Sequence, residues 1–460
     1  MYNEDTIAAI ATPFGTGGIG IIRISGPEAL ALAARVFRPY TPLDWSKARG
    51  FRAHYGHIVA DGQTMDEGIL LVMRAPRSYT GEDVVELQLH GGMLVLQRSL
   101  QLCLQAGARL AERGEFTERA FLNGRIDLTQ AEAVDDIITA KSEVGLGVAV
   151  GQLTGKLSRW VEATGAAVTE LVASLEAVID YPEEDLAELT PAEIDTKLTA
   201  IIIELEVMIA RAAAGKVWKE GLKTVIAGLP NAGKSSLLNQ LLAEERAIVT
   251  DIPGTTRDTI TESALIHGIP LVLVDTAGIR EASDQIEQMG IARTHRELAQ
   301  ADLILAVLDA SQPLTAETRA WLATLQNKAA ILLLNKTDLP LRADLAEVKA
   351  LTGAIPQVAI AARTGTGMDE LGNALATYVE QHRLQAGADS VLLTNVRQED
   401  LARRALASLR SAQQGLHEGL MEDLITEDLR AAWDALGAIV GRNPEASITD
   451  EIFRRFCVGK

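Results

Sequence analysis

The chain has 460 residues, of which 47% are hydrophobic and 23% are charged, a composition that suits a folded protein of two to four domains and excludes a disordered one. The formal net charge of −19 excludes a protein that coats nucleic acid through a broad basic surface, but it leaves room for a small basic patch or a basic partner. Two cysteines, an acidic N-terminus and the lack of a long apolar run predict a cytoplasmic protein without disulfides, signal peptide or membrane span.

The first 120 or so residues mix short β-like runs with turns. Residues 20–25 (GIIRIS) form one such run, and residues 84–90 (VVELQLH) form another in which apolar and polar residues alternate. Alternation predicts a strand with one buried face, and it places Glu86 on the polar face. Residues 15–20 (GTGGIG) match a dinucleotide-binding pattern, but a β-like run follows them where that pattern requires a helix. They therefore indicate a tight turn.

Helical periodicity dominates from about residue 126 to residue 218. Apolar residues recur from Leu157 to Val178 at helical spacings, and residues 190–193 (TPAE) form a capping box that predicts the start of the next helix. Helical periodicity returns beyond residue 390 and continues to Val440. The two helical segments could form one domain into which the residues between them are inserted, or separate domains in series.

Between residues 221 and 382, apolar β-like runs alternate with helical segments. The runs cover residues 224–227, 271–274, 303–308 and 331–334. This alternation predicts a doubly wound parallel sheet with helices on both faces. The expected fold class is thus multidomain, with an α+β N-terminal domain, a helical domain and an α/β domain.

A P-loop follows the first of these runs. Residues 228–235 (GLPNAGKS) stand between the β run and a helix-like segment, which is the context that this motif requires. Backbone N–H groups can surround the phosphates, Lys234 can reach the β and γ oxygens, and Ser235 can ligate Mg²⁺. Asp275, after the second β run, can hold the Mg²⁺ shell, and the N–H of Gly278 can meet the γ-phosphate.

Guanine recognition is indicated after the fourth β run. In residues 335–338 (NKTD), Asp338 can accept hydrogen bonds from guanine N1–H and the 2-amino group, which adenine does not offer in this pattern. We therefore predict GTP rather than ATP. Ala361 stands where GTPases usually carry a serine, so a hydroxyl that braces the base loop is missing, but the backbone of Ala362 could still reach the guanine carbonyl.

The machinery for hydrolysis departs from that of Ras-like enzymes. Ile279 occupies the position of the glutamine that orients water, so another group must act there. Residues 250–258 (TDIPGTTRD) are predicted to be a switch segment in which Thr256 ligates Mg²⁺, whereas Arg257 and Arg280 are interpreted as surface charges. The predicted GTP-binding residues are Asn231, Ala232, Gly233, Lys234, Ser235, Ser236, Thr250, Asp251, Ile252, Pro253, Gly254, Thr255, Thr256, Asp275, Thr276, Ala277, Gly278, Asn335, Lys336, Asp338 and Ala362.

With these motifs in order, the chain resembles the MnmE (TrmE) family of bacterial tRNA modification GTPases over essentially its whole length. The most specific segments are residues 5–8 (DTIA) to 23–26 (RISG), 114–123 (GEFTERAFLN), 254–258 (GTTRD) and 456–460 (FCVGK). The resemblance implies a tetrahydrofolate-binding and dimerisation domain over residues 1–122, a helical domain over 123–220 and 383–460, and a G domain over 221–382.

The resemblance also implies cofactors. A K⁺ ion would replace the arginine finger, held by Asn231 and the carbonyls of Thr250, Ile252 and Thr255, and Glu287 would position the attacking water. A 5-formyltetrahydrofolate-type cofactor would bind at Arg23, Glu86, Arg125 and Lys460. Without the resemblance, Glu287 is an ordinary exposed glutamate, the four folate residues suit surface ion pairs, and Cys457 suits a buried thiol to which we assign no nucleophilic role.

The implied function is GTP hydrolysis in a homodimer that joins a flavin-bearing partner, MnmG (GidA), in a heterotetramer. This complex would modify C5 of the wobble uridine, U34, of certain tRNAs, with tetrahydrofolate as the carbon donor and FAD only on the partner. The alternative is a ribosome-assembly GTPase without modification chemistry, although neither flank carries the basic RNA-binding module that such proteins usually append. A structural dimer with a vestigial nucleotide site is disfavoured by the intact Lys234, Asp275 and Asp338.

Overall fold

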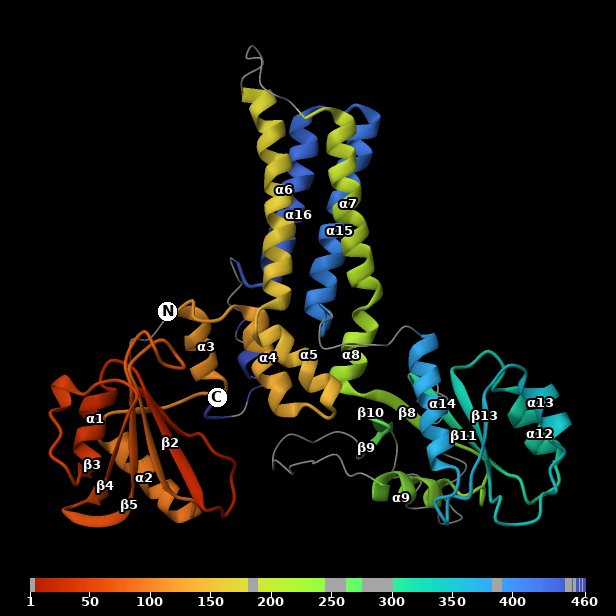
Figure 1. Cartoon of the computed structure of the whole chain (residues 1–460), viewed down its shortest axis with the longest axis horizontal. Coiled ribbons are helices and arrows are strands. Elements are labelled where there is room, and N and C mark those ends of the chain that lie inside the picture. Colours follow the sequence, from red (N-terminus) through yellow and green to blue (C-terminus); the bar gives the residue numbers. More distant parts are fainter. Residues whose placement is uncertain are drawn as a thin grey trace. The chain divides into compact units, whose positions relative to one another are not determined.

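The computed structural model describes residues 5–180, 189–244, 262–274, 301–382, 391–442, 449, 452–454, 456 and 458–460. The chain divides into two compact units, of which the first comprises Met1–Asp135 with Leu436–Lys460 and the second comprises Asp136–Ala435 (Figure 1). Among the described residues, no helix is long and apolar enough to cross a membrane. The domain limits expected at residues 122, 220 and 382 stay predictions.

The first unit is built on a mainly antiparallel sheet with the strand order β3-β4-β5-β6-β2-β1-β7 in its described part. Only the β1–β7 pair is parallel. The predicted strands at residues 20–25 and 84–90 are confirmed as β2 and β6, and the glycines of residues 15–20 lead into β2 rather than into a helix. The strands are β1 (Ile7–Ile10), β2 (Ile19–Ser25), β3 (Phe37–Pro39), β4 (Arg52–Ala60), β5 (Gln63–Met73), β6 (Val84–His90) and β7 (Arg109–Leu110).

Helices bury both faces of this sheet at its centre. Helices α1 (Ala29–Val36) and α2 (Met93–Gln105) pack on the face that carries Ile22 and Leu87. Helix α3 (Glu115–Leu122) covers part of the opposite face, where its Phe116 packs with residues of β1. Because side chains alternate along a strand, Arg23 and Glu86 lie on this second face, as predicted for Glu86.

The helical part contains α4 (Leu128–Thr139), α5 (Glu143–Leu153), α6 (Lys156–Asp180), α7 (Pro191–Ala210), α8 (Ala212–Glu220), α15 (Val396–Glu418) and α16 (Glu422–Ile439). The helix predicted around residues 157–178 is α6, and the capping box at the start of α7 is formed as predicted, with Thr190 and Glu193 exchanging hydrogen bonds.

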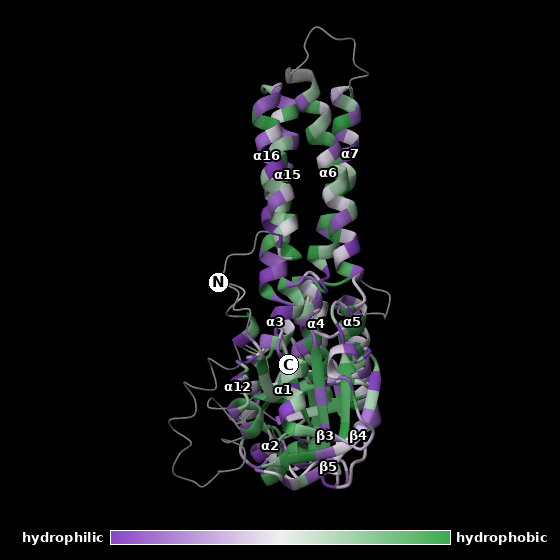
Figure 2. Ribbon diagram, turned by 90° about the vertical axis from the view of Figure 1, so that its left-hand side faces the viewer, coloured by the Kyte–Doolittle hydropathy of each residue, from purple (hydrophilic) through white to green (hydrophobic). Residues whose placement is uncertain are grey.

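The long helices α6, α7, α15 and α16 run side by side and carry both hydrophilic and hydrophobic residues (Figure 2). Helix α15 packs on α7. Polar contacts join the same two helices, because Arg410 pairs with Glu206 at 2.6 Å and Gln413 donates to Asp195 at 2.8 Å. Helices from before and after the α/β segment therefore share one bundle, which favours insertion over domains in series.

The α/β part has the strand order β13-β12-β11-β8-β10-β9 in its described residues, and every pair is parallel except β9–β10. The strands are β8 (Leu222–Ala227), β9 (Glu262–Ile266), β10 (Ile269–Val274), β11 (Leu303–Asp309), β12 (Ala330–Asn335) and β13 (Gln357–Ala359), and the helices are α9 (Lys234–Glu244), α12 (Ala316–Ala323), α13 (Leu345–Thr352) and α14 (Met368–Gln381). Leu305 and Leu333 belong to one core and Ile304 and Leu332 to another on the opposite face. The predicted doubly wound sheet is confirmed.

Candidate functional site

The P-loop lies at the carboxyl end of the central strand β8 and leads directly into α9, which begins at Lys234. A helix N-terminus at this edge of a parallel sheet is suited to anions, because its free N–H groups and its dipole both point at them. Gly233 has φ 101°, and a Cβ there would lie 2.1 Å from Asn335 Nδ2. A Cβ on Gly228 would lie 2.5 Å from the carbonyl oxygen of Val307. The backbone path of the loop therefore requires glycine at both positions.

The ammonium of Lys234 is held by the loop itself. Its Nζ donates to the carbonyl oxygens of Gly228 at 2.9 Å and Leu229 at 3.1 Å. Phosphate oxygens would offer the same ammonium charge-assisted acceptors, which are stronger than carbonyls. Lys234 is thus oriented toward the inside of the loop by backbone contacts that a bound phosphate can replace.

The buried side chain of Asn335 joins the two ends of the candidate nucleotide site. It is 2% exposed, its Nδ2 donates to the carbonyl of Ala232 at 2.8 Å, and its Oδ1 accepts from the N–H of Ala362 at 3.0 Å. A bridge between Ala361 and Thr366 closes the second of these loops. One amide therefore fixes the P-loop relative to the loop predicted to contact the base.

Lys336 and Asp338 follow Asn335 in the loop after β12. Lys336 has the left-handed φ of 65°, and its Nζ lies 2.6 Å from a carboxylate oxygen of Asp309. Burial raises the pKa of Asp309, but hydrogen bonds from Lys336 and Ser311 outweigh it, so the net shift is downward and the carboxylate is ionised at neutral pH. The Asp338 carboxylate lies 3.5 Å from Arg363 Nη2 and its side chain is 24% exposed, which leaves it accessible to a base.

The described residues of the predicted GTP site thus gather at the carboxyl edge of one sheet. They are Asn231, Ala232, Gly233, Lys234, Ser235, Ser236, Asn335, Lys336, Asp338 and Ala362. The other predicted residues, which are residues 250–256, residues 275–278 and Glu287, lie outside the described residues. Strand β10 ends at Val274 and is parallel to β8, so the carboxyl end of β10 lies at the same edge of the sheet. The Mg²⁺, K⁺ and water-positioning roles stay predictions.

A second candidate site lies in the first unit, on the sheet face opposite α1 and α2. Arg23 and Glu86 are register partners on β2 and β6, and Arg23 Nε lies 2.9 Å from Glu86 Oε1. Arg23 Nη1 also donates to the carbonyl of Gly459 at 3.4 Å. A Cβ on Gly459 would lie 2.3 Å from the carbonyl of Ile10, so the C-terminal segment is closely packed here. Arg23 and Glu86, which are both predicted folate residues, thus lie close to Gly459, the residue before Lys460.

Tyr79 joins a third predicted residue to this group. Its ring lies 5.1 Å from the guanidinium of Arg23 and 5.0 Å from that of Arg125, and its hydroxyl forms a 2.9 Å hydrogen bond with Thr117. Cation–π contacts of this kind orient a guanidinium over a ring face. No sequence pattern indicated Tyr79, because Arg23, Arg125 and Thr117 lie far from it along the chain. Cys457 lies outside the described residues.

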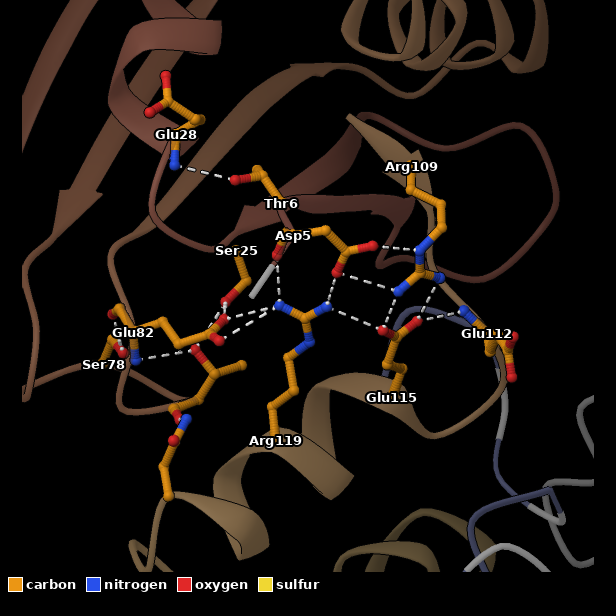
Figure 3. Close-up of polar contacts among 12 residues, drawn as sticks. Asp5, Thr6, Ser25, Glu28, Ser78, Glu82, Arg109, Glu112, Glu115 and Arg119 are labelled. Atoms are coloured by element: carbon orange, nitrogen blue, oxygen red, sulfur yellow. Dashed lines mark hydrogen bonds and ion pairs between the residues drawn. The ribbon is translucent and has the colours of Figure 1, made fainter. Parts of the chain in front are cut away.

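A network of ion pairs holds Asp5, which lies just before β1, against β7 and α3 (Figure 3). Arg119 is 3% exposed, and its guanidinium lies 2.6 Å from Asp5, 3.2 Å from Glu82 and 3.0 Å from Glu115. Arg109 also pairs with Asp5 and Glu115. A hydrogen bond from Arg109 is the main cause that lowers the pKa of Asp5. Burial raises the pKa of Glu115, but hydrogen bonds from Arg109, from the N–H of Glu112 and from Arg119 more than offset it. Residues 114–123 thus include charges that fix the fold around β1.

Comparison with known proteins adds the following relationships. The family model described as "GTP-binding protein TrmE N-terminus" matches residues 6–125, and that described as "MnmE helical domain" matches residues 128–457. Two proteins named tRNA modification GTPase MnmE, from Levilactobacillus brevis and Symbiobacterium thermophilum, are 45% and 48% identical to this chain. Each alignment covers 99% of this chain and 98% or 100% of the relative. A solved G domain of the Thermotoga maritima FeoB iron transporter aligns with 34% of this chain and 98% of its own at 27% identity and a TM-score of 0.25.

Proposed function

Since the chain belongs to the MnmE family of tRNA modification GTPases, we propose that it is the GTP-hydrolysing subunit of a complex that modifies C5 of U34 in certain tRNAs. The observation that carries the proposal is the presence of two separate sites in one chain. In the second unit, Asn335 joins the P-loop to the loop around Ala362, here called the base loop. In the first unit, Arg23 and Arg125 lie against the ring of Tyr79 and form what we call the cationic cluster. A cofactor site in addition to a nucleotide site is what a modification reaction would require.

The residues of the nucleotide site have distinct tasks in this proposal. Lys234 neutralises charge on the β and γ oxygens of GTP, and Ser235, in the first turn of α9, is a hydroxyl ligand for Mg²⁺. Mg²⁺, when bound, would supply positive charge that offsets the charge of the phosphates. Asp338 selects guanine, and Asn335 holds the two loops at a fixed separation. Thr256, Asp275 and Gly278 complete the phosphate end of the site.

We further propose that K⁺ takes the place of an arginine finger. Asn231 lies at the exposed tip of the P-loop with φ 62°, and its side-chain oxygen would bind the ion together with the carbonyls of Thr250, Ile252 and Thr255. Glu287 would position the water, because Ile279 has no polar group. An ion there would stabilise charge that develops between the β and γ phosphates.

Asn231→Ala is expected to abolish the dependence of GTP turnover on K⁺. The unaltered chain should turn over GTP at least about tenfold faster in KCl than in NaCl, and the variant should show equal, slow rates, because the ion loses a ligand. Steady-state phosphate release in the two salts measures this. Asn327→Ala is the matched control, since Asn327 is another exposed asparagine with a left-handed φ of 64°. Equal rates of the unaltered chain in both salts would contradict the proposal.

The cationic cluster, together with Glu86, supports the proposal that the first unit binds a 5-formyltetrahydrofolate-type cofactor. Arg125 and Lys460 would supply cations for its glutamate carboxylates. Glu86, held by its ion pair with Arg23, would supply an acceptor for a pterin amino group. In the proposed reaction, the reduced folate supplies the one-carbon unit. The side chains of Arg23 and Glu86 are only 15% and 13% exposed, so contacts made there are largely shielded from water.

Glu86→Gln is expected to weaken binding of 5-formyltetrahydrofolate by about tenfold or more, because a charge-assisted hydrogen bond is replaced by a weaker neutral one. Isothermal titration calorimetry measures the change. Glu28→Gln removes an exposed carboxylate from the same unit and serves as the control. Unchanged affinity in Glu86→Gln would remove Glu86 from the folate site.

The proposed function as a whole is tested by mass spectrometry of tRNA nucleosides from a deletion strain carrying a plasmid copy of this gene. We expect aminomethyl-type wobble uridines to be absent without the plasmid and restored with it. Unchanged nucleosides, with a defect in ribosomal subunits instead, would favour a ribosome-assembly GTPase. The proposal also includes a homodimer and a flavin-bearing partner of the MnmG (GidA) type, which would contribute FAD.

A further inference from the structure

The chain enters and leaves the α/β segment through two connections that lie against each other. Helix α8 leads into β8, and residues 391–394 lead into α15. A Cβ on Gly215 of α8 would lie 2.1 Å from the carbonyl oxygen of Leu393. A Cβ on Gly145 of α5 would lie 2.5 Å from the carbonyl oxygen of Trp218. Glycine thus allows direct backbone contact between α5, α8 and the outgoing connection.

One buried carboxylate contacts both connections. Asp136 on α4 is 6% exposed, and its Oδ1 lies 2.8 Å from the ammonium of Lys219, near the end of α8. Its Oδ2 is 3.5 Å from the hydroxyl of Thr394, in the outgoing connection. Lys219 and Thr394 are far apart in the sequence, on opposite sides of the whole α/β segment. Asp136 is therefore a point at which the two connections meet.

Neighbouring polar groups complete the arrangement. Gln152 of α5 is 3% exposed, and its Nε2 donates to the carbonyl of Leu392 at 3.0 Å and to the hydroxyl of Thr394 at 3.1 Å. Lys141 donates to the carbonyl of Glu220 at 3.1 Å, and burial lowers the pKa of its ammonium. Each connection is thus held by both a side chain and backbone contacts.

Stability alone is a poor explanation for these charges. A buried ion pair costs desolvation, and apolar residues of similar size often stabilise a fold as well or better. A polar set that is satisfied in only one geometry does specify that geometry. Helix α8 also belongs to the core of the α/β sheet through Ala214, Val217 and Trp218. A rotation of the sheet would therefore move α8 and act directly on the pair between Lys219 and Asp136.

We propose that Asp136 is a positioning residue that fixes both connections of the GTPase domain in one arrangement. A nucleotide-dependent movement of that domain is then transmitted to the helical bundle through α8 and residues 391–394. Flexible connections would not transmit it. The inference rests on the proposed function, in which GTP turnover serves a modification reaction carried out elsewhere in the complex. Asp136 acts through the connections and touches no substrate.

Asp136→Asn tests the proposal because it keeps the size of the side chain and removes its charge. In the full-length chain we expect GTP turnover to stay at the unaltered rate, while modified wobble uridine in the complemented deletion strain falls about tenfold, the size of a typical coupling between sites. Thr394→Val, which removes one hydroxyl from the same group, should have the same effect in a weaker form. Glu170→Gln is the matched control, because it breaks an ion pair of 2.6 Å with Lys197 that joins α6 and α7 away from the connections.

A second measurement distinguishes positioning from general destabilisation. Spin labels at Ala192→Cys in α7 and Asn373→Cys in α14, in a chain with Cys457→Ser, report the distance between bundle and GTPase domain, and the buried Cys103 stays unlabelled. We expect a broader distance distribution in Asp136→Asn than in Glu170→Gln at a temperature where both variants are folded. Equal distributions and equal modification in these two variants would overturn the inference. Failure of the unaltered chain to restore modification would instead overturn the proposed function.

Discussion

Lys234→Ala is expected to lower the kcat for GTP hydrolysis by about 10³-fold, as the loss of a preorganised charge-stabilising donor does. The ammonium is held over the P-loop by the carbonyls of Gly228 and Leu229, and no other described lysine or arginine belongs to that loop. The variant should also bind GTP more weakly, because the triphosphate loses a cation that the P-loop holds in place. Single-turnover hydrolysis at saturating GTP separates the chemical step from binding.

Lys223→Ala provides the control for this experiment. Lys223 belongs to β8, the strand that leads into the P-loop, but its side chain is exposed and the predicted site does not include it. Its removal should leave kcat unchanged. If Lys234→Ala hydrolysed GTP within tenfold of the unaltered rate, the P-loop would not be the catalytic phosphate site.

Asp338→Asn is expected to weaken GTP binding by about 10²-fold or more and to create affinity for xanthosine triphosphate. The carboxylate offers two acceptors to guanine N1–H and the 2-amino group, and each such charge-assisted bond contributes about 1.5–3 kcal/mol. Asparagine offers one acceptor and one donor, which match N1–H and the 2-carbonyl of xanthine. Competition binding with both nucleotides measures the exchange of preference.

The control for this change is Asp369→Asn in α14. Its carboxylate is 96% exposed and lies 3.5 Å from His267, and Asp369 is outside the loop that the bridge between Ala361 and Thr366 closes. The control should keep the original preference for GTP. A variant at Asp338 that still preferred GTP over xanthosine triphosphate would place guanine recognition elsewhere.

Local patterns predicted the elements of both units well. The β runs before the P-loop and before residues 335–338 are central parallel strands, and they are apolar along their length because both faces of the sheet are covered. The capping box at Thr190 was predictable because all its partners lie within four residues. Strand β9 was not predicted, since Glu262–Ile266 is a short edge strand without a strict alternation.

Contacts between distant parts of the chain could not be read from the sequence. Tyr79 gains its role from Arg23 and Arg125, and Asp136 gains its role from Lys219 and Thr394. None of these pairs shares a helix turn or a hairpin, so no periodicity signals them. Folate residues were likewise predicted only through family resemblance, because an isolated arginine or glutamate suits the surface of any protein.

The division of the first unit has a consequence for synthesis of the chain. Its sheet is made from the first residues, but Val458 pairs with Arg113 and Gly459 accepts from Arg23. A nascent chain presents the N-terminal strands first and must then produce the whole of Asp136–Ala435 before these partners exist. The second unit can therefore fold before residues 436–460 of the first unit have been synthesised. The contacts of Arg23 with the segment around Gly459 thus form only after the whole second unit has been synthesised.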